Sequence, residues 1–181
     1  MGKKDLIEEL KKIPEIIYED PYGRHVGLAS GCVSNFYIDV KRACGYPETL
    51  NAICDALYEN LDKRTTCVVA GGYGGTPAVY LAGKYNLKLT LLRMERKQHG
   101  KSSLIEGWAG FIEGYVLTKD DKASFIDDVW TTGGSLRKMI KAIRPSEAEI
   151  VGCNVVVRRG EGNLDDLGIP VKHLLVTEDL L

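Results

Sequence analysis

A buried strand, a glycine-rich turn and a helix follow one another between residues 123 and 143, and this order constrains the fold more than any other stretch. Residues 123–126 are mostly apolar, as in an interior strand of a parallel sheet, and residues 136–143 have the pattern of a helix. The turn contains two adjacent acids, Asp127 and Asp128, and then a run rich in threonine and glycine. Strand, turn and helix in this order indicate an α/β fold, whose ligands bind at the carboxyl ends of the strands.

The turn has the groups that bind a sugar phosphate. Amides at the start of the helix and the hydroxyls of Thr131, Thr132 and Ser135 can donate hydrogen bonds to a phosphate. Carboxylates would repel that phosphate, so Asp127 and Asp128 are expected to face sugar hydroxyls or a divalent cation. The alternative is that the acids and glycines only shape a strand-to-helix turn, because these residues are frequent in turns.

The remaining chain continues the alternation of helices and strands. Apolar residues at helical spacing, or a proline followed by a helical pattern, predict helices over residues 6–17, 47–61, 77–84 and 136–143. Short apolar runs predict strands over residues 36–40, 66–70, 88–92, 123–126, 149–157 and 174–176. We therefore expect one domain over residues 1–181, with a mainly parallel central sheet flanked by helices.

Composition narrows the classes of function. The 181 residues fit one compact domain, and 24 basic against 25 acidic side chains leave the chain almost neutral, so a broad surface for nucleic acid or an anionic membrane is not expected. The five cysteines form no CxxC pair and no zinc-like spacing, so we expect reduced core residues. The N-terminal segment is charged and amphipathic, unlike a signal peptide or membrane span, which predicts a cytoplasmic protein.

A second glycine-rich loop occupies residues 71–75, and Thr76 and Pro77 after it suit the first turn of a helix. The loop is neither a Walker loop nor a GxGxxG fingerprint, and a tight turn is the alternative interpretation. At a neighbouring strand end, it could hold the second phosphate-bearing end of the same ligand. The residues expected to do so are Gly72, Tyr73 and Gly74.

Residues 93–103 are basic and lack hydrophobic periodicity, so they are expected to form a flexible basic loop. The chain then returns to the sheet in a hairpin near Phe111 and Tyr115. A solvated hairpin without further function is the alternative. A cationic lid would suit a reaction that expels diphosphate, because charge builds up on the leaving group.

The run from Asp127 to Ser135 resembles the signature of the type I phosphoribosyltransferases, which bind 5-phosphoribosyl 1-diphosphate. Further stretches resemble the orotate phosphoribosyltransferases within that family: 34–39 (SNFYID), 97–100 (KQHG), 105–107 (IEG), 159–162 (RGEG) and 167–171 (LGIPV). The resemblance covers nearly the whole chain. It implies a type I phosphoribosyltransferase fold with a flexible basic loop and a small hood over the base, to which residues 1–45 contribute.

By this resemblance, the protein transfers the phosphoribosyl group to orotate in pyrimidine synthesis, giving orotidine 5′-phosphate and diphosphate. The resemblance implies a homodimer in which the basic loop of one subunit covers the site of the other. It also implies Mg²⁺ as cofactor, held mainly by the substrate and near Asp127, with no direct protein ligand expected.

Roles for single residues follow from the same resemblance. Asp128 is expected to stabilise positive charge on the ribose, with Asp127 beside it, while Lys97 meets the diphosphate from the neighbouring subunit. Arg159 is expected to pair with the orotate carboxylate, because a guanidinium suits a planar anion. The other expected substrate-binding residues are Arg93, His99, Thr131, Thr132, Gly133, Gly134, Ser135, Gly72, Tyr73, Gly74, Phe36 and Tyr37.

Several positions depart from the family pattern. Ala29 and Cys32 are neutral where basic residues are frequent, Met94 and Gly74 stand where lysine is common, and Arg158 adds a cation beside the base-binding arginine. Each lost charge-assisted hydrogen bond weakens ligand binding by on the order of 1.5–3 kcal/mol. The nearby cations that could compensate are Lys41, Arg42, Arg96 and Lys101.

Two other functions stay open. One is a non-catalytic protein that senses phosphoribosyl diphosphate or a nucleotide with the same cradle, and the other is a phosphoribosyltransferase for another base. The first is disfavoured because a pure sensor does not need the whole set Asp127, Asp128, Lys97, His99 and Arg159. The second is disfavoured because the segment at Arg159 and the tail resemble the orotate branch.

Overall fold

The computed structural model describes residues 2–14, 16–19, 26–27, 33–34, 36–93, 111–160 and 165–181. Its central sheet has six strands in the order β10-β9-β8-β5-β6-β7, and only the β6–β7 pair is antiparallel. The strands are β5 (Cys67–Gly71), β6 (Lys88–Arg93), β7 (Phe111–Gly114), β8 (Lys122–Trp130), β9 (Glu149–Arg158) and β10 (Val171–Val176). This confirms the predicted α/β fold with a mainly parallel central sheet, and the hairpin return at Phe111 is the strand β7.

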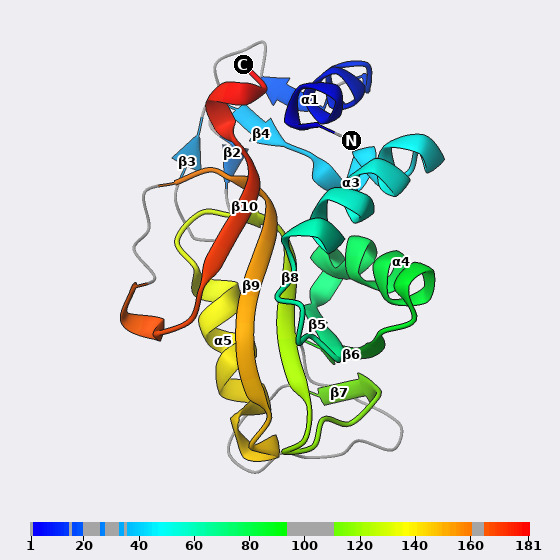
Figure 1. Ribbon diagram of the computed structural model, residues 1–181. Helices are drawn as coiled ribbons and strands as arrows, with labels where there is room; N and C mark the ends of the chain where they lie inside the picture. The colour runs from blue at the N-terminus through cyan, green and yellow to red at the C-terminus, as the bar shows by residue number, and fades with distance from the viewer. Residues whose placement is uncertain are drawn as a thin grey trace, which may run out of the picture.

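Helices cover both faces of the sheet (Figure 1). They are α1 (Lys3–Lys11), α2 (Val40–Ala43), α3 (Pro47–Asn60), α4 (Thr76–Tyr85) and α5 (Gly134–Ile143). Short 3-10 turns are η1 (Gly72–Gly75), η2 (Arg144–Ser146), η3 (Asp165–Leu167) and η4 (Thr177–Asp179). Helices α1 to α4 pack on one face of the sheet, in a core that includes Ile53, Leu81 and Ile126. Helix α5 packs on the other face, with Met139 against Phe125 in the second core.

Four predicted helices and six predicted strands are present, and several boundaries differ from the predicted ones. The first helix was expected to reach Ile17, but α1 ends at Lys11 and Ile17 opens strand β1. Pro14 explains the difference, because proline has no amide donor and clashes with the preceding turn of a helix. The strand expected over 36–40 ends at Ile38, because the Asp39 carboxylate accepts from the Arg42 amide at 3.0 Å and caps α2.

Strand β8 is longer than the sequence predicts. It was expected to end at Ile126, yet it continues to Trp130, so Asp127 and Asp128 belong to the strand and not to the turn after it. Pairing with β9 causes this, because Asp127 lies opposite Val155 and Trp130 opposite Arg158. The turn therefore begins only at Thr131.

Two small antiparallel sheets lie beyond the carboxyl ends of the main strands, at the top of Figure 1. Strand β1 (Ile17–Glu19) pairs with β4 (Phe36–Ile38), and β2 (Val26–Gly27) pairs with β3 (Val33–Ser34). Among the described residues, no helix is long and apolar enough to cross a membrane.

At the opposite end of the sheet, Asp121 connects several elements. Its buried carboxylate accepts from the Lys88 ammonium at 2.7 Å, from the Tyr115 hydroxyl at 3.0 Å and from the Thr118 amide at 3.0 Å. Burial alone would raise the pKa of Asp121, but these hydrogen bonds outweigh it and hold the pKa well below its usual value. The network joins the starts of β6 and β8.

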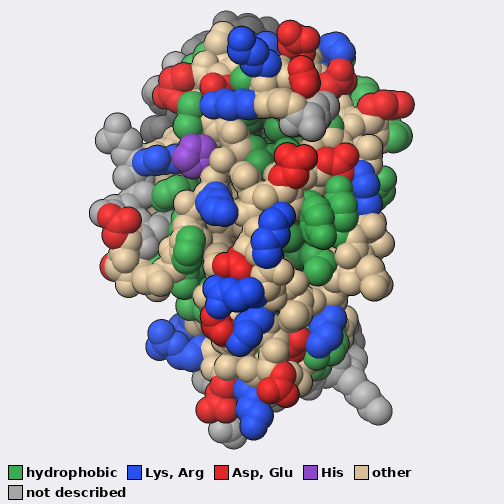
Figure 2. Space-filling view, viewed as in Figure 1, with side chains coloured by type: hydrophobic (Ala, Val, Ile, Leu, Met, Phe, Trp, Pro, Cys, Tyr) green, Lys and Arg blue, Asp and Glu red, His purple; other side chains and the backbone are tan. Residues whose placement is uncertain are grey.

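Charges of both signs are mixed over the face shown in Figure 2, as the near-neutral composition predicts. Part of this mixture is paired, because Glu149 accepts from Arg64 at 2.8 Å and from Lys122 at 2.6 Å. No broad surface of one sign is visible on that face.

Candidate active site at the carboxyl ends of the strands

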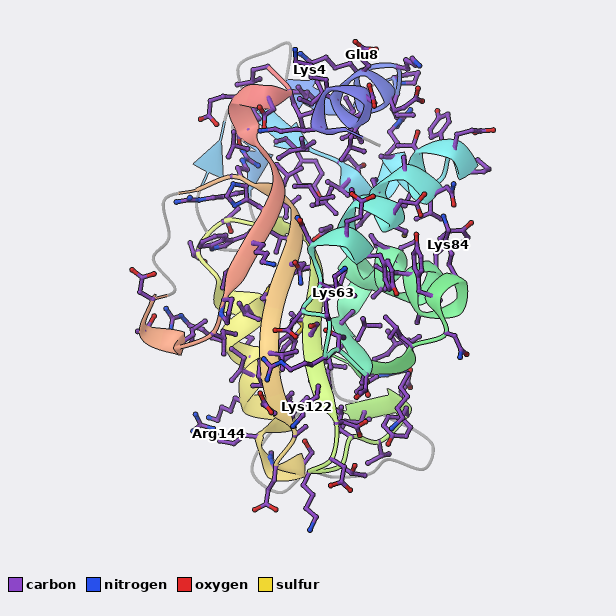
Figure 3. The ribbon with its side chains drawn as sticks, viewed as in Figure 1. Lys4, Glu8, Lys63, Lys84, Lys122 and Arg144 are labelled. Carbon is purple, nitrogen blue, oxygen red and sulfur yellow. The ribbon has the colours of Figure 1, made fainter. Side chains whose placement is uncertain are left out.

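A cavity of about 380 Å³ opens where β5, β8 and β9 end. Its lining comes from five parts of the chain: β4 with α2, the end of β5 with the start of η1, the end of β8 with the following turn and α5, β9 with the residue after it, and the start of β10. Lys122 and Arg144 mark the other end of the sheet, away from the cavity (Figure 3). The cavity therefore has the location that α/β folds use for ligands.

The turn from Thr131 to Ser135 forms one wall of the cavity. Gly133 has φ of 76°, in the left-handed region, and α5 begins at the next residue. This conformation is easy only for glycine, and it turns the chain directly from the strand into the helix. The first amides of α5 therefore lie at the cavity wall beside the hydroxyls of Thr132 and Ser135, as a phosphate site requires.

Asp127 and Asp128 are consecutive residues of β8, and both line the cavity. Backbone amides hold both side chains at the strand end: the Asp128 amide donates to Asp127 Oδ1 at 3.0 Å, and the Val129 amide donates to Asp128 Oδ1 at 2.8 Å. Burial and the adjacent charge of Asp128 raise the pKa of Asp127. Without a ligand, two such carboxylates repel each other, and a ligand with donors or positive charge would relieve this.

Side chains alternate along a strand, so the two acids leave β8 towards opposite faces. Two buried thiols agree with this. Cys153, in the core beside α5, has a pKa raised by burial and then by Asp127. Cys44, in the core of α1 to α4, has a pKa raised to about 11 by burial and then by Asp128. The cavity therefore straddles the edge of the sheet.

Lys41 approaches Asp128 from α2. Its Nζ lies 3.6 Å from Asp128 Oδ2, and its side chain is 43% exposed. Burial lowers the pKa of Lys41, but the nearby charge of Asp128 contributes most to outweighing it, so the pKa is raised. The sequence named this lysine only as one of four spare cations, because nothing in the pattern shows which side of α2 faces β8.

Arg159 lies at the end of β9, in the cavity lining. Its guanidinium donates through Nη2 to the Phe36 carbonyl and lies 4.3 Å from the centre of the Phe36 ring. Burial lowers the pKa of Arg159. The contact attaches β4, and with it the small N-terminal sheet, to the main sheet.

The backbone around Arg159 is fixed by the end of β8. The Arg159 amide donates to the Trp130 carbonyl at 2.7 Å, and the Arg158 guanidinium lies 5.1 Å from the centre of the Trp130 ring. A Cβ atom on Gly160 would lie 2.6 Å from the Thr131 carbonyl oxygen. Trp130 and Gly160 lie in stretches that the sequence singled out, but neither residue received a role of its own from the sequence, because both act through contacts between distant segments.

The remaining predicted residues divide into three groups. Tyr37 and Gly72 line the cavity, whereas Tyr73 and Gly74 belong to η1 beside it. Arg93 ends β6, donates to Glu113 Oε1 at 2.6 Å and is not part of the lining of this cavity. The residues that fall outside the described part of the chain are Lys97, His99, Ala29, Cys32 and Met94.

Comparison with known proteins identifies this architecture. Residues 67–178 match the phosphoribosyl transferase domain family. The orotate phosphoribosyltransferase of Methanopyrus kandleri is 33% identical over 99% of this chain and 92% of its own, and that of Aquifex aeolicus is 33% identical over 100% and 98%. The chain belongs to the orotate phosphoribosyltransferase family.

The solved structures agree with this assignment. The orotate phosphoribosyltransferase of Aeropyrum pernix superposes with a TM-score of 0.76 at 28% identity, over 97% of this chain and 96% of its own. The resemblance stated from the sequence is thereby confirmed for the family and the fold. In this orotate phosphoribosyltransferase fold, the cavity, the carboxylate pair and Arg159 meet at one end of the sheet.

Proposed function

We propose that the protein transfers the 5-phosphoribosyl group from 5-phosphoribosyl 1-diphosphate to orotate, which yields orotidine 5′-phosphate and diphosphate. The observation that carries this proposal is a single cavity lined by three features: the turn that leads into α5, the adjacent carboxylates of Asp127 and Asp128, and the partly buried guanidinium of Arg159. Each matches one part of the two substrates: a phosphate, a ribose and a planar carboxylate. The relatives named orotate phosphoribosyltransferase support the same choice of base.

The geometry suggests how the two substrates are held. The amides at the start of α5 and the hydroxyls of the turn bind the 5-phosphate, and Asp127 and Asp128 accept hydrogen bonds from the ribose hydroxyls. As the bond from the anomeric carbon to diphosphate breaks, positive charge builds up on the ribose. The carboxylate of Asp128 stabilises that charge, because it is fixed beside the ribose before the reaction starts.

Arg159 binds the acceptor. Its guanidinium is held at the cavity wall by Phe36, and burial strengthens its interaction with an anion. The carboxylate of orotate then orients the ring nitrogen towards the anomeric carbon. Tyr37, on the same small sheet, lines the cavity next to this position and excludes water from it.

The residues present fit a magnesium ion that is held mainly by the substrate. Among the described residues, no group of three or more acidic, histidine or cysteine side chains could hold a metal alone. Mg²⁺ usually keeps several waters and takes phosphate oxygens from the substrate, so it would lie near Asp127 without a direct protein ligand. Bound there, Mg²⁺ would neutralise charge on the diphosphate.

The basic loop and the dimer belong to the same proposal. Lys97 and His99 would contact the diphosphate from the neighbouring subunit of a homodimer, with Arg93 at the base of the loop. The hood formed by residues 1–45 would close over the base. The predicted cytoplasmic location stays a prediction.

The test is an assay with purified protein, magnesium, phosphoribosyl diphosphate and orotate, in which the fall of orotate absorbance is followed. Uracil, adenine and hypoxanthine serve as parallel acceptors. Orotate should be consumed and the other bases should not. If the protein consumes only another base, that base replaces orotate in the proposal. If it binds phosphoribosyl diphosphate without transfer to any base, a non-catalytic sensor is favoured.

Substitution of the acceptor arginine tests the base assignment. Arg159→Gln should raise the KM for orotate about tenfold or more and change the KM for phosphoribosyl diphosphate little, because one charge-assisted pair with the acceptor is lost. Arg144→Gln is the control, since Arg144 lies at the far end of α5 (Figure 3). An unchanged KM for orotate in Arg159→Gln would remove this residue from the acceptor site.

A further inference from the structure

The diphosphate end of the cavity lies on a definite face of the sheet. Extending the β5–β8 register, in which Val69 lies opposite Phe125, by two residues sets Gly71 beside Asp127. The loop η1 then leads into α4, whose Ala78 and Leu81 are buried in the core of α1 to α4. The glycine loop and Asp128 therefore lie on the same side of the sheet edge.

This end of the cavity needs a cation. The loop sequence Gly71-Gly72-Tyr73-Gly74-Gly75 supplies amides but no positive side chain, and the neighbouring Asp127 and Asp128 supply none either. A diphosphate that leaves from the ribose gains negative charge, which amides alone stabilise poorly. A positive side chain close to both the loop and Asp128 would balance it.

Lys41 lines the same cavity as Gly71 and Gly72 at the start of the loop, and it lies beside Asp128. Helix α2 presents Val40 and Ala43 to the core of α1 to α4, and its lysine lines the cavity, with Nζ 3.6 Å from Asp128 Oδ2. The other cations that line the cavity in the described part of the chain are Arg159, which contacts Phe36, and Lys138, which belongs to α5 on the opposite face.

The contact with Asp128 leaves Lys41 able to bind a ligand. A separation of 3.6 Å is longer than a hydrogen bond, and the side chain is 43% exposed, so the ammonium is near its partner without being locked to it. An ammonium has three donors, and one carboxylate oxygen does not use them all.

We propose that Lys41 binds the diphosphate of phosphoribosyl diphosphate from within the same subunit. In the absence of substrate the ammonium balances Asp128. When substrate binds, the ammonium contacts the diphosphate oxygens and Asp128 accepts from the ribose hydroxyls. The inference rests on the proposed function only in that the substrate has a diphosphate, and it does not depend on which base accepts the ribose.

The experiment measures binding without any acceptor base. Wild type, Lys41→Met and Lys41→Arg are titrated calorimetrically, in the presence of magnesium, with phosphoribosyl diphosphate, with inorganic diphosphate and with ribose 5-phosphate. Lys41→Met should bind the two diphosphate ligands about tenfold or more weakly, since one charge-assisted contact is lost, and ribose 5-phosphate as well as wild type does. Lys41→Arg should keep most of the affinity.

The matched control is Arg42→Met, which removes a positive charge from the next position of α2, outside the cavity lining. Thermal unfolding of all variants shows whether the fold is kept. Equal weakening for ribose 5-phosphate in Lys41→Met would mean that Lys41 acts only through Asp128, and unchanged affinity for diphosphate would also overturn the proposal. Because the titrations contain no acceptor base, their result can be interpreted even if the protein does not consume orotate.

Discussion

Two buried aspartates of the central sheet have pKa values that move in opposite directions. Asp121, at the amino end, is surrounded by donors, and its pKa is lowered because those hydrogen bonds outweigh burial. Asp127 lies near the carboxyl end, and its pKa is raised because it is removed from water and lies next to the charge of Asp128. The first carboxylate accepts several hydrogen bonds within the fold, whereas the second accepts from the Asp128 amide and lines the cavity.

Asp121 should contribute to stability in a pH-dependent way. Its folded-state pKa lies below the unfolded value of about 3.9, so the ionised group stabilises the fold at neutral pH. The contribution is lost as the pH falls below the unfolded value towards the folded one. Asp121→Asn should lower the free energy of unfolding by about 2 kcal/mol at neutral pH.

Urea unfolding at neutral pH and at about pH 2.5 checks this, because the difference between wild type and Asp121→Asn should shrink at the acid end. Asp120→Asn is the control, since Asp120 is the exposed neighbour in the same turn. A deficit of the same size at both pH values would show that the side chain contributes by its shape and not by its charge.

At the scale of elements, the end of β9 and the turn after β8 form one unit. Gly160 abuts the Thr131 carbonyl, and the Arg159 amide donates to the Trp130 carbonyl. Arg159, proposed to bind the acceptor, and the turn proposed to bind phosphate are therefore joined by backbone contacts. A shift of one would displace the other.

Gly160→Ala should test that contact. The added Cβ would meet the Thr131 oxygen at 2.6 Å, so the backbone has to move, with a destabilisation of about 1–3 kcal/mol and higher KM values for both substrates. Gly83→Ala is the matched control, because Gly83 lies inside α4 with nothing within 4 Å of the new Cβ, so the variant should be at least as stable as wild type. Unchanged KM values in Gly160→Ala would show that the two segments act independently.

The elements themselves could be predicted because apolar periodicity is local. Leu136, Met139 and Ile143 predict α5, and the apolar run after Thr66 predicts β5. The motif at 127–135 could be found because its residues are contiguous in the sequence. The longer β8 and the contacts of Trp130 and Lys41 could not be found, since they depend on which distant segment lies alongside.

At the scale of the whole molecule, the predicted homodimer can be tested by complementation. Lys97→Ala and Asp128→Asn chains should each be inactive, because each lacks one group of the site. If Lys97 reaches the site of the neighbouring subunit, a mixed dimer has one intact site, and equal mixing should recover about a quarter of wild-type activity.

Mixed dimers are formed by unfolding and refolding the two variants together. In the control, each inactive variant is unfolded and refolded alone. Recovery only in the cross-mixture supports a shared site. No recovery, together with a mass that shows mixed dimers, would place Lys97 in the site of its own subunit.

The arrangement of β5 and β8 has a consequence for how the chain folds. They are neighbours in the sheet, yet β5 ends at Gly71 and β8 begins at Lys122, so their pairing must close a long loop. Such closure is slow, because its entropy is lost before the contacts form. The cavity takes Gly72 from one side of this junction and Asp128 from the other, so a chain in which β5 and β8 are unpaired lacks the complete cavity. We therefore expect a ligand of this cavity to slow the unfolding of the finished protein and to leave its folding rate unchanged.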